Sequence, residues 1–402
     1  MRKVLWALIA AIIAGAVPMY SADLDIAAAG NTAFAFELYN KVKQHEGGDR
    51  NVFFSPLSIS AALSMTYAGA RGETEKQMAQ TLHFSLPQQR LHTAWSELMS
   101  DLNGATHYEL AIANRLWGQK GFDFVNDFLK LAETKYQGGL DLVDFASNPE
   151  ACRKTINQWV EEKTKRKIKD LLLFGDIKTL TRLVLTNAIY FKGSWIAKFD
   201  PKKTVDAPFT LPDGKTTVLA AMMSQTARFG YMEDSLLQAL ELPYSGKRLS
   251  LLVLLPRKGA DLSRVEKALT SENLIRWRSA LAPEEVKVFL PKFKTTLRFL
   301  LNDPMKELGI NDAFDEFKAD FSGMTGRRNL YISKIIHKAF VDVNEEGTEA
   351  AAATAVVMDT KSMRMEPVFR ANRPFVFMIL DKKSGSILFL GRITNPKQQD
   401  NS

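Results

Sequence analysis

The 402-residue sequence has a single cysteine, Cys152, and so it cannot form an intrachain disulfide bond. It also lacks any Asn-x-Ser/Thr glycosylation sequon. A chain of this length can bury enough apolar surface to be stable without disulfides, so their absence does not exclude an exported protein. Together the two absences favour a prokaryotic exported protein.

Enzymatic and metal-binding motifs are missing as well. The sequence has no G-x-S-x-G, H-E-x-x-H or G-x-G-x-x-G pattern. Its five histidines show no metal-ligand spacing with Cys152. Catalytic groups can assemble from distant residues, so missing motifs are weak evidence on their own. We nevertheless expect no metal, no cofactor and no enzymatic activity.

Linkers and repeats are also absent. No Pro/Gly/Ser-rich segment, charge block or internal repeat divides the chain. Its 46% hydrophobic and 24% charged residues are typical of a globular protein. We therefore predict a single domain over residues 23–402, although the length alone would suggest two or three domains.

Residues 1–22 differ from the rest of the chain. Arg2 and Lys3 precede an apolar run, Val4–Val17, which is short for a membrane span. This pattern predicts a signal peptide cleaved after residue 16 or 22, and an uncleaved anchor is the alternative. We therefore expect a secreted or periplasmic monomer with no membrane association beyond export.

The net charge of +8 and the pI near 9.3 raise the possibility of a nucleic-acid or polyanion partner. The densest basic run, residues 163–169, falls at the end of a predicted helix, where cations complement the helix dipole. A solvated helix end explains this run better, so we predict no nucleic-acid partner.

The most informative stretch is residues 345–362, E-E-G-T-E-A-A-A-A-T-A-V-V-M-D-T-K-S. Four alanines favour a helix, whereas Gly347 and the two valines near the end do not. In a strand, Thr348 and every second residue after it would face one side, and all of these are small or apolar. Such a strand could enter an existing sheet with little steric cost.

This stretch resembles the reactive-loop hinge of the inhibitory serpins, the serine-protease inhibitor superfamily. The hinge residues that carry the resemblance are Glu345, Glu346, Gly347, Thr348, Glu349, Ala350, Ala351, Ala352 and Ala353. The loop as a whole would cover about residues 345–366. By the family's usual spacing, the reactive bond lies between Lys361 and Ser362, and Arg364 is a rival position.

Three further stretches resemble serpin motifs, in the same order along the chain. They are N-V-F-F-S-P-L-S-I at 51–59, L-V-L-T-N-A-I-Y-F-K-G-S-W at 183–195, and L-F-L-G-R-I-T-N-P at 388–396. Ser55 followed by Pro56 also predicts a helix start, since these are a favoured cap and first residue. The resemblance implies an α+β serpin fold, in which helices surround mixed sheets and a large central sheet.

The resemblance also implies a mechanism. A serine protease would attack the carbonyl of Lys361 to form an acyl-enzyme, and the cleaved loop would then insert into the central sheet. Because an acidic specificity pocket favours a long cation, Lys361 predicts a trypsin-like partner bound covalently. Large, charged or proline side chains at inward hinge positions would slow insertion, and Thr348 is neither large nor charged.

Residues that hold the sheet closed are implied as well. Ser55, Ser58, Asn187 and His337 resemble the buried polar cluster where serpin central strands separate. Trp195 and Lys292 resemble contacts at the end where insertion begins, with Lys292 pairing Glu345. Buried polar groups need partners, and an ordinary hydrogen-bonded cluster without a gating role is the alternative.

Two other functions fit the same fold. A non-inhibitory serpin would act as a carrier or chaperone, but the alanine-rich hinge argues against this role. A cysteine-protease inhibitor would use the loop in the same way through a thioester, and Lys361 does not exclude it.

Overall fold

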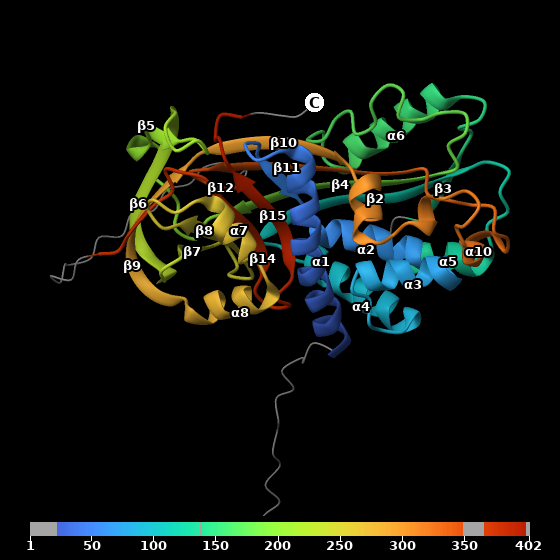
Figure 1. The fold of residues 1–402 in the computed structure, drawn as a ribbon, viewed down its shortest axis with the longest axis horizontal. Helices are drawn as coiled ribbons and strands as arrows, with labels where there is room; N and C mark the ends of the chain where they lie inside the picture. Colours follow the sequence, from blue (N-terminus) through green and yellow to red (C-terminus); the bar gives the residue numbers. More distant parts are fainter. Residues whose placement is uncertain (1–21, 137–138, 349–365, 399–402) are drawn as a thin grey trace, which may run out of the picture.

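The structure, a computed structural model, describes residues 22–136, 139–348 and 366–398. The described chain forms helices packed around two β-sheets (Figure 1). The helices are α1 (Ala22–Glu46), α2 (Pro56–Tyr67), α3 (Gly72–Thr81), α4 (Gln88–Asn103), α5 (Asn126–Tyr136), α6 (Pro149–Lys163), α7 (Leu262–Lys267), α8 (Ser271–Ala280), α9 (Asn302–Leu308) and α10 (Ser322–Thr325), with two 3-10 turns, η1 (Pro201–Lys203) and η2 (Asp312–Phe314).

One sheet has six strands in the order β10-β11-β12-β4-β2-β3, and β11 also pairs directly with β4. Its strands are β2 (Tyr108–Gln119), β3 (Leu140–Val143), β4 (Leu183–Ser194), β10 (Phe293–Leu300), β11 (Lys334–Asn344) and β12 (Gly347–Thr348). The middle strand β4 is buried along most of its length, which is why it reads as a nearly continuous apolar run.

The second sheet has nine strands. Eight follow the order β1-β15-β14-β8-β7-β6-β9-β13, and β5 pairs with the other end of β6. The strands are β1 (Val52–Phe54), β5 (Val205–Thr210), β6 (Thr217–Glu233), β7 (Leu237–Pro243), β8 (Leu249–Pro256), β9 (Ala282–Pro291), β13 (Val368–Arg370), β14 (Phe375–Asp381) and β15 (Ile387–Ile393). The short strand β13 is the first element after the predicted reactive loop.

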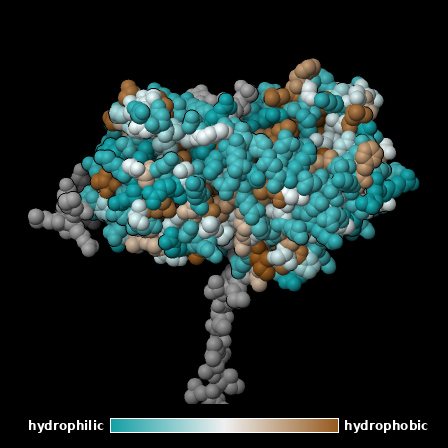
Figure 2. Space-filling view, in the orientation of Figure 1, coloured by the Kyte–Doolittle hydropathy of each residue, from teal (hydrophilic) through white to brown (hydrophobic). Residues whose placement is uncertain are grey.

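Helices cover both faces of the six-stranded sheet. Figure 1 shows α6 on one side of it and α1 to α5 on the other. Ile156 and Val160 of α6 are fully buried against sheet residues such as Trp117 and Ile336. Over the other face lies the larger core, where α2 is buried along its whole length. The face shown in Figure 2 is mainly hydrophilic, with scattered hydrophobic residues.

Local signals predicted the start of α2 correctly. The Ser55 hydroxyl oxygen accepts a hydrogen bond of 3.1 Å from the Ser58 amide, and Pro56 is the first helical residue. This cap ends β1 and turns the chain directly beneath the six-stranded sheet. The predicted α+β fold, with mixed sheets surrounded by helices, is confirmed. In the described residues, every helix is too short or too polar to cross a membrane.

Candidate functional site

The site is organised by the boundary between β4 and β11, which we call the seam. From Val184 to Tyr190, β4 pairs in parallel with β11, and Asn187 lies opposite His337. Beyond this stretch the two strands diverge, and β12 lies between them, antiparallel to both. Two hinge residues therefore already occupy the gap at one end of the sheet, while the rest of the seam is closed.

Gly347 has to be glycine at this place. Its φ of +152° is one that side chains disfavour, and an added Cβ would lie 2.0 Å from the carbonyl oxygen of Gly193. The next residue, Thr348, is completely buried, and its Oγ1 lies 2.7 Å from the hydroxyl of Tyr244. The backbone approach and the buried hydroxyl pair together fix the hinge in the gap.

Trp195 anchors the entrance to the gap. Its Nε1 donates a 3.0 Å hydrogen bond to the Asn344 carbonyl, and its backbone amide donates one of 3.0 Å to the Glu346 carbonyl. The indole also stacks on the Tyr244 ring, with the ring centroids 4.5 Å apart. The tryptophan thus touches the end of β11, the hinge and the tyrosine that holds Thr348.

The predicted pair of Lys292 and Glu345 is present. Lys292 Nζ lies 2.8 Å from Glu345 Oε2, and Thr204 donates a 2.8 Å hydrogen bond to Oε1. Burial acts to raise the pKa of this carboxyl, but the bonds from Lys292 and Thr204 outweigh it, so the pKa lies below its usual value. Next to it, Lys198 Nζ lies 2.7 Å from Glu346 Oε2. Both hinge glutamates are therefore paired with a lysine.

The four predicted cluster residues meet at the closed part of the seam. Ser55 donates its amide to His337 Nε2 at 3.1 Å, and His337 Nδ1 bonds the side-chain oxygen of Asn187. Asn187 Nδ2 donates to Ser58 Oγ at 2.7 Å. A fifth residue, Asn114 of β2, accepts through Oδ1 from Asn187 at 2.5 Å and from Ser58 Oγ at 3.1 Å. The His337–Asn187 bond crosses the seam.

These hydrogen bonds fix the state of the imidazole. Because Nε2 accepts from an amide, the proton of the neutral ring is on Nδ1, which donates to Asn187. The ring is fully buried, and this burial lowers the pKa of His337 to about 3. A protonated ring would direct a second N–H at the Ser55 amide, so the cluster requires a neutral histidine.

Sequence reasoning missed four residues of the site, namely Lys198, Asn114, Tyr244 and Thr204. Asn114 interrupts the apolar strand Ala111–Trp117 just as Asn187 interrupts β4, so the same signal was available for it. Tyr244 lies in a P-Y-S-G turn and Thr204 follows a 3-10 turn. Only the three-dimensional arrangement brings these two to the hinge.

The remaining predicted residues lie outside the described part of the chain. They are the reactive pair Lys361 and Ser362, the rival Arg364, and the hinge residues Glu349, Ala350, Ala351, Ala352 and Ala353. Their roles, and the gating role of the described site residues, stay predictions. Within residues 22–136, 139–348 and 366–398, no group of three or more His, Cys, Asp and Glu side chains is arranged to hold a metal ion.

The chain is similar to proteins of known family along nearly its whole length. Residues 29–396 match the sequence model of the serpin family, described as serine protease inhibitor. The chain is 46% identical to human Serpin B8, with 93% of this chain and all of the relative covered. It is also 46% identical to the bovine leukocyte elastase inhibitor, over 92% of this chain and 99% of the relative.

Solved structures agree with these matches. Human thyroxine-binding globulin in complex with its hormone superimposes with a TM-score of 0.86 at 36% identity, covering 94% of this chain and 100% of that chain. Uncleaved ovalbumin superimposes with a TM-score of 0.83 at 28% identity, covering 92% and 100%.

The predicted location was wrong. The amino-terminal pattern led us to expect a secreted or periplasmic protein, whereas Serpin B8 and the leukocyte elastase inhibitors are intracellular serpins. An apolar run behind two cations describes only some twenty residues, and similarity over more than 90% of the chain outweighs it.

The sequence matches, the strand order of the six-stranded sheet and the position of Gly347 and Thr348 between β4 and β11 all indicate the same family. The relatives are protease inhibitors rather than catalytic enzymes. The chain belongs to the serpin family.

Proposed function

We propose that this chain inhibits a trypsin-like serine protease as a suicide substrate. The protease would attack the carbonyl carbon of Lys361 and form an acyl-enzyme. Before water can hydrolyse that ester, the freed loop would insert into the six-stranded sheet and carry the protease with it. The inhibitor thus uses the catalytic chemistry of its target.

The observation that carries this proposal is the position of β12. Thr348 is paired with Gly193 on β4 and with Val343 on β11, so the first two residues of an inserted strand are already in register. Continuing that antiparallel register along β4 would set Ala350 opposite Phe191 and Thr354 opposite Asn187. The extended segment 348–361 would be roughly 43 Å long at about 3.3 Å per residue.

Insertion along this path has to open the seam. It would separate Asn187 from His337, which are now register partners joined by a hydrogen bond. It would also replace parallel pairing of β4 and β11 by antiparallel pairing on both sides of the new strand, which is the more stable arrangement per residue. The buried polar cluster would then resist opening until the loop is cut.

The identity of the target rests on Lys361. A long cation at the cleaved bond suits an acidic specificity pocket, as in trypsin-like enzymes. An elastase-type target is the second candidate, because several relatives are named leukocyte elastase inhibitors. A carrier role remains the alternative from another class, because thyroxine-binding globulin is among the similar structures. The small residues of the hinge favour inhibition over that role.

The first experiment compares two proteases. The protein is incubated separately with trypsin and with leukocyte elastase, and the mixtures are separated by denaturing electrophoresis. We expect a band at the summed mass with trypsin only. A band with elastase only would overturn the trypsin-like specificity. Clean cleavage with both proteases fully active would overturn inhibition itself and leave a carrier role.

Variants then test the bond and the hinge separately. Lys361→Ala should abolish the covalent band with trypsin, whereas Arg364→Ala should leave it intact; the reverse result would move the reactive bond. Thr348→Arg should turn the inhibitor into a substrate, because burying a charge at this fully buried position carries a large desolvation free energy and would slow insertion. Thr134→Arg on the exposed face of α5 is the matched control.

A further inference from the structure

A large cavity away from the seam is lined by α7 and by strands and loops of the nine-stranded sheet. Its volume is about 1510 Å³, more than the 300–1000 Å³ of a usual small-molecule site. Several separate segments line it: the end of α1, the β5–β6 turn, parts of β6 and β7, the β8–α7 loop with α7, the stretch before β14, and the end of β15. The segments meet only in the folded chain.

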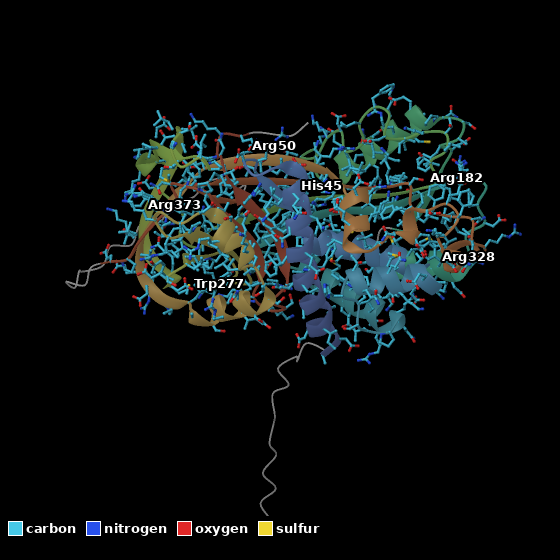
Figure 3. All side chains as sticks on the ribbon, in the orientation of Figure 1. His45, Arg50, Arg182, Trp277, Arg328 and Arg373 are labelled. Atoms are coloured by element: carbon cyan, nitrogen blue, oxygen red, sulfur yellow. The ribbon has the colours of Figure 1, made fainter. Side chains whose placement is uncertain are left out.

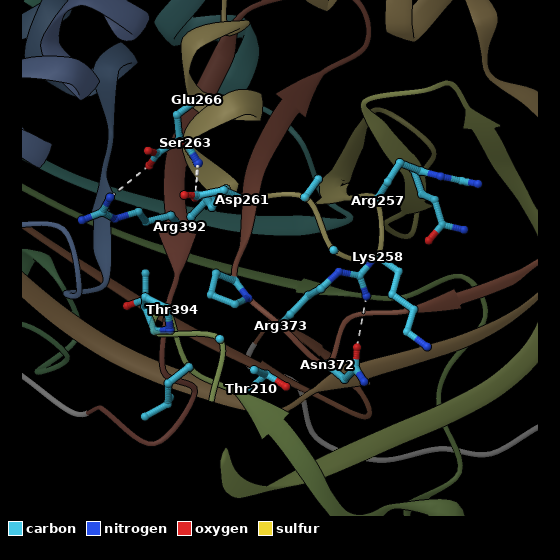
Figure 4. A pocket seen from close by; sticks show the side chains of 18 of the residues that line it. Thr210, Arg257, Lys258, Asp261, Ser263, Glu266, Asn372, Arg373, Arg392 and Thr394 are labelled. Atoms are coloured by element: carbon cyan, nitrogen blue, oxygen red, sulfur yellow. Dashed lines mark hydrogen bonds and ion pairs between the residues drawn. The ribbon is translucent and has the colours of Figure 1, made fainter. Parts of the chain in front are cut away.

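At one end of the cavity Glu266 is ion-paired with two cations, one of which is Arg392 (Figure 4). Glu266 lies 3.0 Å from Arg392 and 3.2 Å from Lys43, and it accepts a 2.7 Å hydrogen bond from Tyr39. Lys43 and Arg392 are thus both already engaged by Glu266. Arg257, Lys258 and Arg373 lie at the other end.

Most of the acidic residues that line the cavity already have an ion-pair or hydrogen-bond partner. Glu233 pairs with Arg257 at 2.5 Å. Asp213 accepts from the amides of its own turn, and Asp261 accepts from the Ser263 amide at the start of α7. Of the acidic lining residues, this leaves Glu366 at the loop end and Asp49 at the α1 end.

Arg373 is the unusual cation. It is partly buried and lies at the end of the molecule away from Arg182 and Arg328 (Figure 3). Its Nε and Nη2 donate to the Pro256 carbonyl, and Nη1 donates to the Arg370 carbonyl and to Asn372 Oδ1. All these acceptors are neutral. Burial, and then the positive charge of Arg257, lower the pKa of Arg373.

Two neighbouring cations also lack a carboxylate partner among the described residues. Lys258 is exposed on the cavity rim, and its side chain makes no ion pair with the described chain. The Arg370 guanidinium lies 3.5 Å from the ring centroid of Phe289, an uncharged partner. Lys258, Arg370 and Arg373 therefore line the cavity from two loops, and the contacts of all three with the described residues are to uncharged groups or absent.

We propose that this end of the cavity binds the phosphate or carboxylate group of a small molecule whose uncharged body fills the rest of the cavity. Arg373 has one Nη2 hydrogen without an acceptor among the described residues, and Lys258 supplies a mobile second charge. Leu211, Pro212 and Leu262 provide apolar wall for the body of the ligand. The proposal does not depend on protease inhibition.

The site adjoins the anchor of the reactive loop. Strand β13 is held by the bond from the Lys287 amide to the Pro367 carbonyl, and Gln238 Nε2 donates to the Val368 carbonyl at 3.1 Å. A ligand that joins Lys258 to Arg373 would bridge the β8–α7 loop and the segment that follows β13. Binding should therefore also raise the thermal stability of the protein.

Calorimetric titration with three probes tests the proposal: phenyl phosphate, 3-phenylpropionate and inorganic phosphate. We expect phenyl phosphate or 3-phenylpropionate to bind at least about tenfold more tightly than inorganic phosphate, and the stronger of the two identifies the head group. At ten times its Kd, that probe should raise the melting midpoint by about 2 °C. No binding by either aromatic probe, or equal binding by inorganic phosphate, would overturn the proposal.

A charge-reversal variant locates the site. Lys258→Glu should weaken the binding of the stronger probe about tenfold or more, since it replaces an attractive contact by a repulsive one. Lys258 is exposed, so folding should be unaffected. Lys130→Glu on the exposed face of α5 changes the net charge equally and should leave binding unchanged. If both variants bind like the wild type, the ligand does not occupy this end of the cavity.

Discussion

Mild acid should weaken the seam through His337. The cluster needs the neutral imidazole, because Nε2 accepts from the Ser55 amide while Nδ1 donates to Asn187 across the seam. In the unfolded chain the same ring is exposed and takes up a proton near pH 6.5. Between this pH and the folded pKa of about 3, folding must therefore expel that proton.

The size of the effect follows from the two pKa values, 6.5 for the free side chain and about 3 in the fold. Because the folded pKa is depressed, the stabilisation is fully present above pH 6.5 and is lost as the pH falls toward 3. At about 1.4 kcal/mol per pH unit in this window, roughly 2 kcal/mol is lost between pH 7.5 and 5. His92, whose pKa burial lowers to about 4, should lose a similar amount.

The assay is denaturant unfolding at pH 7.5 and at pH 5, where carboxylates are still largely ionised in both states. The wild type should lose about 4 kcal/mol between the two conditions, and His337→Gln and His92→Gln should each lose about 2 kcal/mol. The readout is the difference between the pH values, because either substitution also changes the stability at pH 7.5. A His337→Gln protein that shows the full wild-type drop would refute the reasoning.

Three further predictions concern single contacts. Tyr244→Phe leaves the buried Thr348 hydroxyl without its partner, so it should cost about 1–2 kcal/mol and speed amide hydrogen exchange at Thr348 about 5–30-fold; unchanged exchange would contradict this. Gly347→Ala places a Cβ against the Gly193 carbonyl, and the same exchange experiment should show the hinge leaving the gap. Asp176 binds Arg298 of β10 and, at 2.8 Å, Lys334 of β11, and thereby ties the segment before β4 across the seam. Asp176→Asn should therefore speed uptake of a synthetic peptide with sequence 348–361, and an unchanged rate would exclude this latch.

The sequence predicted best where local rules decide. The Ser55–Pro56 helix start and the buried run of β4 follow from capping and burial, which act over a few residues. Asn187 was found because it interrupts an apolar strand, and its partner Asn114 carries the same signal on β2. What could not be foreseen is which polar residues meet. That depends on strand register, and a shift of one residue would turn each side chain to the opposite face.

Other parts of the site had no local signal at all. Lys292 and Glu345 are 53 residues apart, and the family resemblance alone suggested their pairing. Tyr244 reads as a turn residue, yet its ring lies between Trp195 and Phe191 and its hydroxyl holds the hinge. The charged residues in the sequence establish the net charge, but they do not show which charged side chains lie together in the fold. The mixed wall of the cavity near Arg373 arises from several segments that are far apart in the sequence.

The proposed mechanism requires that the intact protein is less stable than the cleaved protein with its loop inserted. The strand pairing at the seam provides a physical reason for this difference. Seven register pairs join β4 to β11 in parallel, although a strand antiparallel to both would give better hydrogen bonds, and β12 shows that the gap accepts such a strand. While the loop is intact, both of its ends are fixed, by β12 at one side and by β13 pairing with β9 at the other. Cutting one bond between these anchors frees the segment that follows β12 to continue along β4.

The protein cleaved by trypsin should therefore melt at a clearly higher temperature than the intact protein, as scanning calorimetry can measure. An equal or lower midpoint would mean that no better arrangement is available, and trapping by insertion would then lose its driving force.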